Sequence, residues 1–477
     1  MSVIFGAIDI GASSGRVIAG SIKNGVIQLH EVHRFPNGPV DQNGTLVWEF
    51  PALLSEVKVG LSELANYATE QGAKVVSIGI DTWAVDYGLL RNGELLANPN
   101  SYRDPKNQIG VEKTHSLIEF SELYQVSGLQ FLPFNTIYQL VRQQELNPDL
   151  LEQATDILMI PDLIGFFLTG QKASEKTNAS STGLFDAKTR NWSKEIAQAT
   201  GLTETLEKFA PLRSSGEVLG ALTLDLGHAL NGCEIVLVGS HDTASAVVGV
   251  PATSGRNFAF ISSGTWSLLG SEIEAPILSE ASRKANFTNE LGVSDRIRYL
   301  KNLSGLWLLA ECLRDWGLES NPQALFELLE QAKQHVPDQL LELDDESLIA
   351  PGDMVAKISR QLDAGGHPIP KARAGFVALI LHSLAASYAE NLTSLEELAQ
   401  QSFDSIYVVG GGSQNELLSQ LTANYSGKRV ICGPVEATAI GNLVVQMQAA
   451  ALIPAGLGQA RKVIANSFQQ KTYEPEG

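Results

Sequence analysis

Residues 239–251 read GSHDTASAVVGVP and join a predicted strand to a predicted helix. The apolar run 235–238 before them predicts a buried strand, and the small residues from Thr243 to Val250 predict a helix. Asp242 therefore lies at a strand-to-helix turn, where α/β proteins expose side chains at the carboxyl end of their sheet. Its carboxylate could act there as a general base on a hydroxyl group, or it could cap the helix, since Asp is a preferred N-cap. This segment alone leaves both interpretations open.

The composition bounds the class of protein. A chain of 477 residues is too long for one ordinary core and predicts two to four domains. Its formal charge of −19 argues against non-specific binding of nucleic acid, which requires neutralised phosphates. The sequence contains no run of about 18 apolar residues, so we expect no membrane span. The first residues lack the basic segment of a signal peptide. Three cysteines without a CxxC pair argue against a disulfide scaffold or a zinc site, so we expect a cytoplasmic protein.

One pattern occurs twice. Residues 5–20 predict a strand, a Gly/Ser-rich tip and a second strand, and residues 258–270 repeat the pattern. Successive backbone N–H groups at such a tip can bind an anion, although a Gly/Ser turn is more often only a hairpin. The pair suggests a duplicated lobe, which predicts one lobe over residues 1–252 and another over 253–477, with a linker at 251–256.

Two aspartates lie at the ends of apolar strands. Asp9 is costly to bury without a partner, so either a metal ion or a buried hydrogen-bond network should accompany it. Asp81 ends a second such strand, and Trp83 after it could stack on a sugar or belong to the core, which is the commoner case. The region 100–233 looks mainly helical and is interpreted as an insertion that forms one wall of a cleft.

The second half ends in another glycine-rich segment. Residues 406–415 predict a strand that runs into the triple glycine 410–412, and an amphipathic helix follows from Glu416. Glycines let the backbone approach a nucleotide closely, although a lone GGG is a weak signal. Further helices are predicted at 50–71, 305–311, within 320–400 and at 436–451.

Taken in order, these segments resemble the FGGY family of carbohydrate kinases. Within that family they are most similar to the kinases that act on the ketose L-rhamnulose. The resemblance covers nearly the whole chain and is specific as a set. It is carried by residues 9–16, 79–83, 102–104, 134–136, 240–247, 262–267, 301–307, 410–415 and 433–438.

The resemblance implies an α/β protein with duplicated actin-like (ribonuclease H-like) ATPase lobes and a cleft between them. It implies that ATP, with Mg²⁺, phosphorylates the 1-hydroxyl of L-rhamnulose. Asp242 is then the catalytic base, its carboxylate should point into the cleft, and Thr243 or the free N–H groups at the helix start can find other partners. Asp9 matches the aspartate on the metal side. The implied sugar contacts are Trp83, Ala84, His241, Asp242, Thr243 and Asn302. The implied ATP contacts are Ala12, Ser13, Ser14, Gly15, Arg16, Gly264, Thr265, Ala310 and Gly411.

Two positions depart from the family pattern. Ala84 replaces a sugar-contacting glycine and could narrow the sugar pocket, and Ala310 replaces a glutamine that contacts the nucleotide. Another ketose, such as L-fuculose or L-xylulose, therefore stays open as the substrate. Two alternatives belong to other functional classes: an actin-like ATPase without a sugar substrate and a non-catalytic sugar sensor. We expect a monomer or a homodimer that binds a small sugar and ATP, and neither nucleic acid nor a membrane.

Overall fold

The computed structural model describes residues 2–253, 257–348 and 352–476, which form two compact units. Each unit is built from segments that are distant in the sequence. The first comprises Met1–Thr253, Glu272–Tyr299 and Ala437–Phe468. The second comprises Ser254–Ser271, Leu300–Glu436 and Gln469–Gly477. The exact lobe bounds inferred from the sequence stay predictions, and residues 254–256 of the linker lie outside the described residues.

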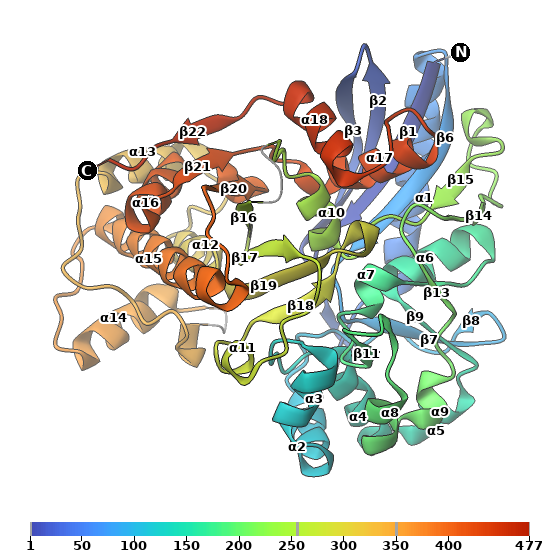
Figure 1. Ribbon diagram of the computed structural model, residues 1–477, viewed down its shortest axis with the longest axis horizontal. Helices are drawn as coiled ribbons and strands as arrows, with labels where there is room; N and C mark the ends of the chain where they lie inside the picture. Colours follow the sequence, from blue (N-terminus) through green and yellow to red (C-terminus); the bar gives the residue numbers. More distant parts are fainter. Residues whose placement is uncertain (1, 254–256, 349–351, 477) are drawn as a thin grey trace. The chain divides into compact units, whose positions relative to one another are not determined.

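The first unit is centred on a six-stranded sheet with the order β14-β15-β6-β1-β2-β3 (Figure 1). β1 pairs in parallel with β6, and β6 in parallel with β15, whereas β1, β2 and β3 form an antiparallel meander. The turn between β2 and β3 is formed by Asn24 and Gly25, which both have positive φ. The strands are β1 (Ser2–Ile10), β2 (Ser14–Lys23), β3 (Val26–Pro36), β6 (Ala73–Thr82), β14 (Val218–Ala221) and β15 (Glu234–Val236).

Two helices from opposite ends of the sequence cover this sheet. Alternate residues of β1 point to opposite faces, so Ile8 packs in one core cluster with α1 (Phe50–Glu70) and Phe5 in another with α17 (Ala437–Ala449). α17 also packs closely on α10 (Asp242–Val248), because a Cβ on Gly441 would lie only 1.9 Å from the Ser245 carbonyl oxygen. α18 (Leu457–Ser467) completes this face, with the Ser467 hydroxyl accepting the Ile27 N–H at 2.9 Å.

A ladder of buried amides joins α17 to the sheet. Gln446 donates to the Gly6 carbonyl at 2.8 Å and accepts from the Ser77 hydroxyl at 2.7 Å. Asn442 donates to the Asp81 carboxylate at 2.6 Å. Gly79 leaves the room for both amides, because a Cβ there would lie 2.2 Å from the Asn442 Oδ1. The ladder therefore fixes the end of β6 against a helix encoded far later in the chain.

The rest of the first unit is a mainly helical region with short strands, as the sequence predicts for 100–233. It has its own hydrophobic core and a three-stranded sheet with the order β8-β7-β9. Its helices are α2 (Asn107–Leu117), α3 (Phe120–Ser127), α4 (Thr136–Leu146), α5 (Pro148–Gln153), α6 (Ile160–Thr169), α7 (Lys176–Ala179), α8 (Lys194–Ala199), α9 (Thr203–Leu206) and α11 (Glu280–Lys284). Its strands are β4 (Val40–Asp41), β5 (Leu46–Val47), β7 (Tyr87–Arg91), β8 (Glu94–Leu95), β9 (Asp156–Met159), β10 (Ser174–Glu175), β11 (Phe185–Asp186), β12 (Asn191–Trp192), β13 (Leu212–Arg213) and β18 (Thr288–Leu291).

The second unit contains the strand order β19-β17-β16-β20-β21-β22. β16 pairs antiparallel with β17 and in parallel with β20, which pairs in parallel with β21. The predicted strand–tip–strand pattern of 258–270 is thus present. The strands are β16 (Phe258–Ser263), β17 (Trp266–Ile273), β19 (Ile297–Ser304), β20 (Ser405–Val409), β21 (Arg429–Cys432) and β22 (Lys471–Tyr473). The helices are α12 (Trp307–Asp315), α13 (Pro322–Ala332), α14 (Met354–Ala364), α15 (Arg373–Ala399) and α16 (Glu416–Ser426).

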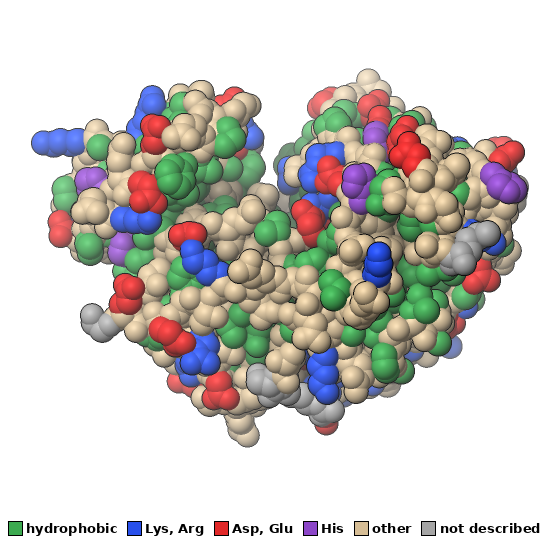
Figure 2. Space-filling view, turned by 90° about the horizontal axis from the view of Figure 1, so that it is seen from above, with side chains coloured by type: hydrophobic (Ala, Val, Ile, Leu, Met, Phe, Trp, Pro, Cys, Tyr) green, Lys and Arg blue, Asp and Glu red, His purple; other side chains and the backbone are tan. Residues whose placement is uncertain are grey.

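The surface carries a mixture of side chains. Figure 2 shows acidic, basic and hydrophobic side chains interspersed on the face that it displays. None of the helices within the described residues is both long enough and apolar enough to cross a membrane. Cys233, Cys312 and Cys432 are buried free thiols.

Candidate active site

Three carboxylates of the first unit lie at the carboxyl ends of neighbouring strands. In the parallel register of β1 and β6, Asp9 stands opposite Asp81. The segment before Asp242 continues the order, because Thr82 donates its N–H to the Ser240 carbonyl at 2.9 Å and forms a parallel bridge with His241. The residues that the sequence assigned to strand ends are therefore brought together at one edge of the sheet, as α/β ligand sites are.

Asp9 is buried with a cation beside it. Its Oδ2 accepts from Arg16 Nε at 3.0 Å and from Nη2 at 2.7 Å. Arg16 stands opposite Asp9 in the antiparallel register of β1 and β2, at the end of the predicted phosphate-binding tip. The sequence suggested either a metal ion or a hydrogen-bond network beside Asp9, and these contacts with Arg16 supply the hydrogen bonds.

The tip before Arg16 is a closed turn. Gly11 donates its N–H to the Ser14 carbonyl at 2.9 Å, and Asn37 donates its N–H to the Ser13 carbonyl at 3.0 Å. Ser13 is exposed, whereas Ala12 and Ser14 are half-buried and Gly15 lies under the Phe35 ring. The turn thus presents Ser13 and its neighbours to solvent on a backbone that is held in place.

Asp81 is the most deeply buried of the three carboxylates. Its Oδ2 accepts from Asn442, but its Oδ1 has no hydrogen-bond partner among the described residues. Burial raises its pKa well above the usual range, and the negative charges of Asp9 and Asp242 add to the effect. Negative potential is therefore concentrated at this edge of the sheet, which suits a cation, although the described residues hold no ready-made cluster of three or more metal ligands.

Asp242 does not cap its helix. The N-cap of α10 is His241, and Asp242 is the first helical residue. Its Oδ1 accepts from the Thr243 N–H at 2.6 Å and from the Thr243 hydroxyl at 3.1 Å, while its Oδ2 has no hydrogen-bond partner among the described residues. The expectation that Thr243 finds other partners is wrong, because both of its donors hold one oxygen of Asp242. The carboxylate is thereby anchored on one side and left open on the other, with about a third of the side chain exposed.

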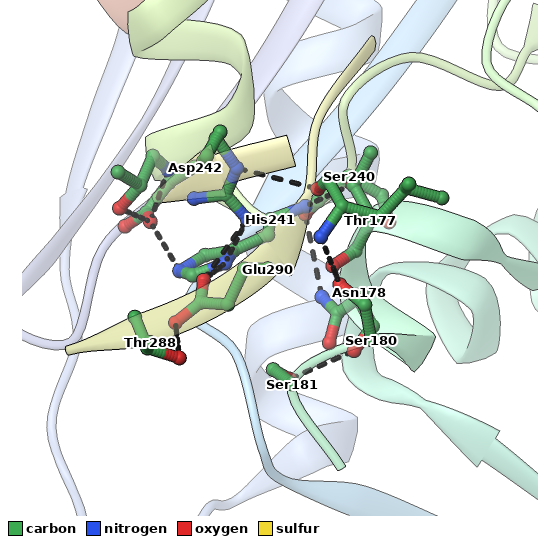
Figure 3. A network of polar contacts seen from close by, with 12 residues as sticks. Thr177, Asn178, Ser180, Ser181, Ser240, His241, Asp242, Thr288 and Glu290 are labelled. Atoms are coloured by element: carbon green, nitrogen blue, oxygen red, sulfur yellow. Dashed lines mark hydrogen bonds and ion pairs between the residues drawn. The ribbon is translucent and has the colours of Figure 1, made fainter. Parts of the chain in front are cut away.

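A polar network lies behind Asp242 (Figure 3). Glu175, which is fully buried, accepts from the Ser240 N–H at 3.2 Å and from the Ser240 hydroxyl at 2.8 Å. It also accepts from the Thr177 N–H at 2.9 Å, and the Thr177 hydroxyl accepts the His241 N–H at 3.3 Å. Burial raises the pKa of Glu175. These contacts fix the backbone that carries the 240–243 segment.

The predicted sugar contacts Trp83 and Ala84 lie in one turn of unusual backbone. Val85 in this turn has φ +69, an outlier for a β-branched residue and therefore a strained position. Asp86 holds the turn, since its Oδ2 accepts from the indole nitrogens of Trp83 at 3.0 Å and Trp48 at 2.6 Å. Burial raises the pKa of Asp86 to about 6 despite these donors. Trp83 is only 6% exposed, which favours the core interpretation of this ring, whereas Ala84 is half-buried.

The second unit places Gly264 and Thr265 after β16 and Gly411 after β20, at the carboxyl ends of two neighbouring parallel strands. Thr265 is exposed at the tip between β16 and β17, and its carbonyl accepts the Trp307 N–H at 3.1 Å. Gly410 has φ +84, and a Cβ there would lie 2.8 Å from the Ser263 carbonyl oxygen, so the triple glycine lies directly against the tip. Gly411 is exposed, with open space where a side chain would project.

The other predicted residues of this unit lie along one segment. The Gly264 carbonyl accepts the Leu306 N–H at 3.0 Å, which joins the tip to the start of α12. Ala310 is exposed on α12, and Asn302 is half-buried on β19. These contacts are all made within the second unit.

Sequence reasoning missed four residues of the first unit. Asp86 holds the turn of Trp83, Asn442 bonds to Asp81, and a buried pair of Glu290 and Arg298 contacts His241. Asp86 stands between apolar residues and could have been found by the argument applied to Asp9. The others had no local signal, because strands and helices often carry isolated polar residues on an exposed face.

Known proteins match this chain over nearly its whole length. Models of the N-terminal and C-terminal domains of the FGGY family of carbohydrate kinases match residues 4–249 and 259–450. The chain is 40% identical to the rhamnulokinase of Oceanobacillus iheyensis over 98% of this chain and 97% of that protein. It is 37% identical to the rhamnulokinase of Bacillus subtilis over 99% of this chain and 96% of that protein. The structure of a gluconate kinase from Lactobacillus acidophilus matches with a TM-score of 0.80 at 15% identity, covering 100% of this chain and 94% of that one. These matches confirm the predicted two-lobed α/β fold.

Proposed function

The chain belongs to the FGGY family of carbohydrate kinases, and on that premise we propose that it transfers the γ-phosphoryl group of ATP to the 1-hydroxyl of L-rhamnulose. The products are L-rhamnulose 1-phosphate and ADP. The choice of sugar is supported by the shared name of the relatives, which are rhamnulokinases at 37–40% identity over nearly the whole chain.

The carboxylate of Asp242 is the observation that carries the proposal. Its Oδ1 is anchored by Thr243, so its Oδ2 can accept the proton of the sugar hydroxyl. The sugar oxygen then forms a bond to the γ-phosphorus as the bond from phosphorus to the ADP oxygen breaks. In such a loose transition state the proton leaves late, so a carboxylate of ordinary basicity is sufficient.

His241 and Thr243, which contact the other oxygen of Asp242, are assigned to orient the sugar. Trp83 and Ala84 form the neighbouring turn, where the Ala84 methyl group limits the space for the sugar. Asn302 in the second unit supplies a further polar contact to it. We assign the tip residues Ala12 to Arg16 to the phosphates of ATP, together with Gly264, Thr265 and Gly411 of the second unit. Ala310 offers only a methyl group where the family has an amide.

The cation fits the acidic edge of the sheet. The buried Oδ1 of Asp81, which lacks a hydrogen-bond partner among the described residues, lies beside Asp9, and carboxylate oxygens are ligands that Mg²⁺ prefers. Because Mg²⁺ keeps several of its bound waters, the protein need not supply three ligands. Asp9 would hold the ion. When bound, Mg²⁺ neutralises charge on the β- and γ-phosphates. The two hydrogen bonds from Arg16 orient the Asp9 carboxylate for this role.

We also infer the cytoplasm as the compartment, since the buried free thiols of Cys233, Cys312 and Cys432 suit a reducing environment. A monomer or a homodimer remains our expectation for the assembly.

A coupled ADP-release assay tests the function. The purified chain is given ATP and Mg²⁺ with L-rhamnulose, L-fuculose, L-xylulose or glycerol in turn. We expect the highest kcat/KM for L-rhamnulose and no sustained ADP release without sugar. A higher kcat/KM for another ketose would replace the substrate but keep the reaction. ADP release that no sugar stimulates would overturn the kinase assignment in favour of a sugar-independent ATPase.

A further inference from the structure

Glu290 and Arg298 form an ion pair in the interior of the first unit. Arg298 Nη2 lies 3.0 Å from Glu290 Oε2, and both side chains are at least nine-tenths buried. Burial alone would raise the pKa of Glu290, but the Arg298 guanidinium lowers it to about 2, so the carboxylate stays charged. Removing two charges from water costs several kcal/mol each, and an apolar pair of similar volume is often as stable. The pair therefore calls for an explanation other than stability.

The pair contacts the imidazole next to Asp242. Arg298 Nη2 lies 3.1 Å from His241 Nδ1, at hydrogen-bond geometry. A guanidinium has donors and no acceptor, so Nδ1 must be the acceptor in this bond. In neutral His241 the ring proton then lies on Nε2. Nη2 carries two hydrogens, so its ion pair with Glu290 can form beside this bond. The Glu290 Oε2 also lies 3.2 Å from the His241 Nδ1.

The other ring nitrogen faces the base. His241 Nε2 lies 3.4 Å from Asp242 Oδ1, the same oxygen that accepts from both donors of Thr243. The ring therefore stands beside the anchored oxygen of the carboxylate. Oδ2 remains the oxygen with an open side.

We propose that the Glu290–Arg298 pair is a positioning device for the base. The pair fixes the orientation of the His241 ring, with Nδ1 towards Arg298 and Nε2 towards Oδ1 of Asp242, so that Oδ2 stays open to receive the sugar proton. The proposal rests on the function proposed above. Arg298 and Glu290 touch neither reactant and act only through the ring.

Charged groups on four elements face the His241 ring or its supports. Arg298 on β19 donates to Nδ1. The other three are Asp242 on α10, Glu290 on β18 and Glu175 on β10, which reaches the segment through Ser240. A change in any of them can therefore alter the position of the ring, so the test removes Glu290 and Arg298 together.

The test combines ¹⁵N NMR of the histidine rings with kinetics on the full chain. The native protein should show a protonated Nε2 and an unprotonated Nδ1 for His241, assigned with a His241→Gln variant. A double variant, Glu290→Gln with Arg298→Met, removes both charges so that neither is buried alone. In it, the ¹⁵N signals should show the His241 ring proton distributed between Nδ1 and Nε2, and kcat should fall about tenfold or more. The KM for ATP should not change.

A second buried pair is the matched control. Glu272 and Arg461 lie 2.6 Å apart, are as buried, and Arg461 also donates to the Val247 carbonyl on α10. Glu272→Gln with Arg461→Met therefore loosens the same helix without touching His241, and its kcat should stay within twofold of the native value. Arg298→Lys keeps a donor at Nδ1 and should restore part of the activity; it also serves if the double variant fails to fold.

Two results would overturn the proposal. One is a proton on Nδ1 of His241 in the native protein. The other is a Glu290/Arg298 variant whose kcat equals that of the control pair. If instead no sugar is phosphorylated by the native chain, the proposed function fails, while the NMR result still decides the state of the ring.

Discussion

Replacing Asp242 by asparagine separates the role of this residue in catalysis from its role in the fold. The amide oxygen of the substituted side chain can still accept from the Thr243 N–H and hydroxyl, which in the native protein lie 2.6 and 3.1 Å from Oδ1. Because the side chain is also about one-third exposed, we expect the free energy of unfolding to change by less than about 1 kcal/mol.

The same substitution removes the base. The amide nitrogen that replaces Oδ2 has no lone pair for the sugar proton. General base catalysis contributes about 10²–10⁴-fold, which corresponds to roughly 3–5 kcal/mol of transition-state stabilisation. We therefore expect kcat with L-rhamnulose to fall at least about 10²-fold, with a nearly unchanged KM for ATP.

The measurement is the coupled ADP-release assay, with thermal unfolding of the same sample and its mass as a check against deamidation. Thr243→Val is the control, because it removes one donor from Oδ1 and keeps the base; losing one hydrogen bond of about 1 kcal/mol should lower kcat about fivefold at most. A kcat of Asp242→Asn within tenfold of the native value, in a folded sample, would show that another group takes the proton.

Four further outcomes can be checked. Thr265→Ala removes an exposed hydroxyl at the tip of the second unit and should raise the KM for ATP about tenfold, which corresponds to the loss of a hydrogen bond to a charged group. The KM for sugar should stay nearly unchanged, and the reverse pattern would count against the assignment of Thr265 to the phosphates. Ala84→Gly frees the space of one methyl group, so kcat/KM for L-fuculose or L-xylulose relative to L-rhamnulose should rise about tenfold, and an unchanged ratio would exclude Ala84 from the sugar pocket. Gly79→Ala places a Cβ 2.2 Å from a buried amide oxygen of α17 and should lower the free energy of unfolding in urea by about 2–4 kcal/mol, whereas Gly38→Ala, with nothing within 4 Å, should not. The pKa of Glu290 in the folded protein is depressed to about 2, so the charged carboxylate stabilises the fold above its ordinary pKa of 4.5, and this stabilisation is lost as the pH falls towards 2. The difference in free energy of unfolding between the native protein and Glu290→Gln should shrink by about 3 kcal/mol between these pH values, and a constant difference would refute the ion pair.

The parts of the site that could be predicted from the sequence are those with a local signal. An aspartate inside an apolar strand is costly, and this argument found Asp9 and Asp81, which the parallel register of β1 and β6 sets side by side. The two glycine and hydroxyl tips were found because each lies between apolar strands. Such features depend on neighbours in the chain, so short windows of sequence carry them.

The remaining features depend on contacts between distant segments. Asn442 looks like an ordinary polar residue of a helix until the fold places it on Asp81, 361 positions away. Arg298 looks like a strand residue facing solvent, yet it is fully buried against His241. Thr243 was expected to be able to bond elsewhere if Asp242 is not a cap, and only the side-chain geometry shows that it anchors Asp242. The pairing of such residues is set by the packing of whole elements.

The amide ladder on α17 also constrains how the polypeptide is made. Gln446 is a hydrogen-bond partner of both Gly6 and Ser77. Because the central strands are synthesised first, these two groups lack that partner until residue 446 has emerged from the ribosome. A nascent chain that stops after the N-terminal family domain would expose the apolar face of β1 that Leu443 and Val444 cover. Biosynthesis of this enzyme therefore includes a long interval in which an unfinished sheet is available to chaperones, to proteases and to other nascent chains.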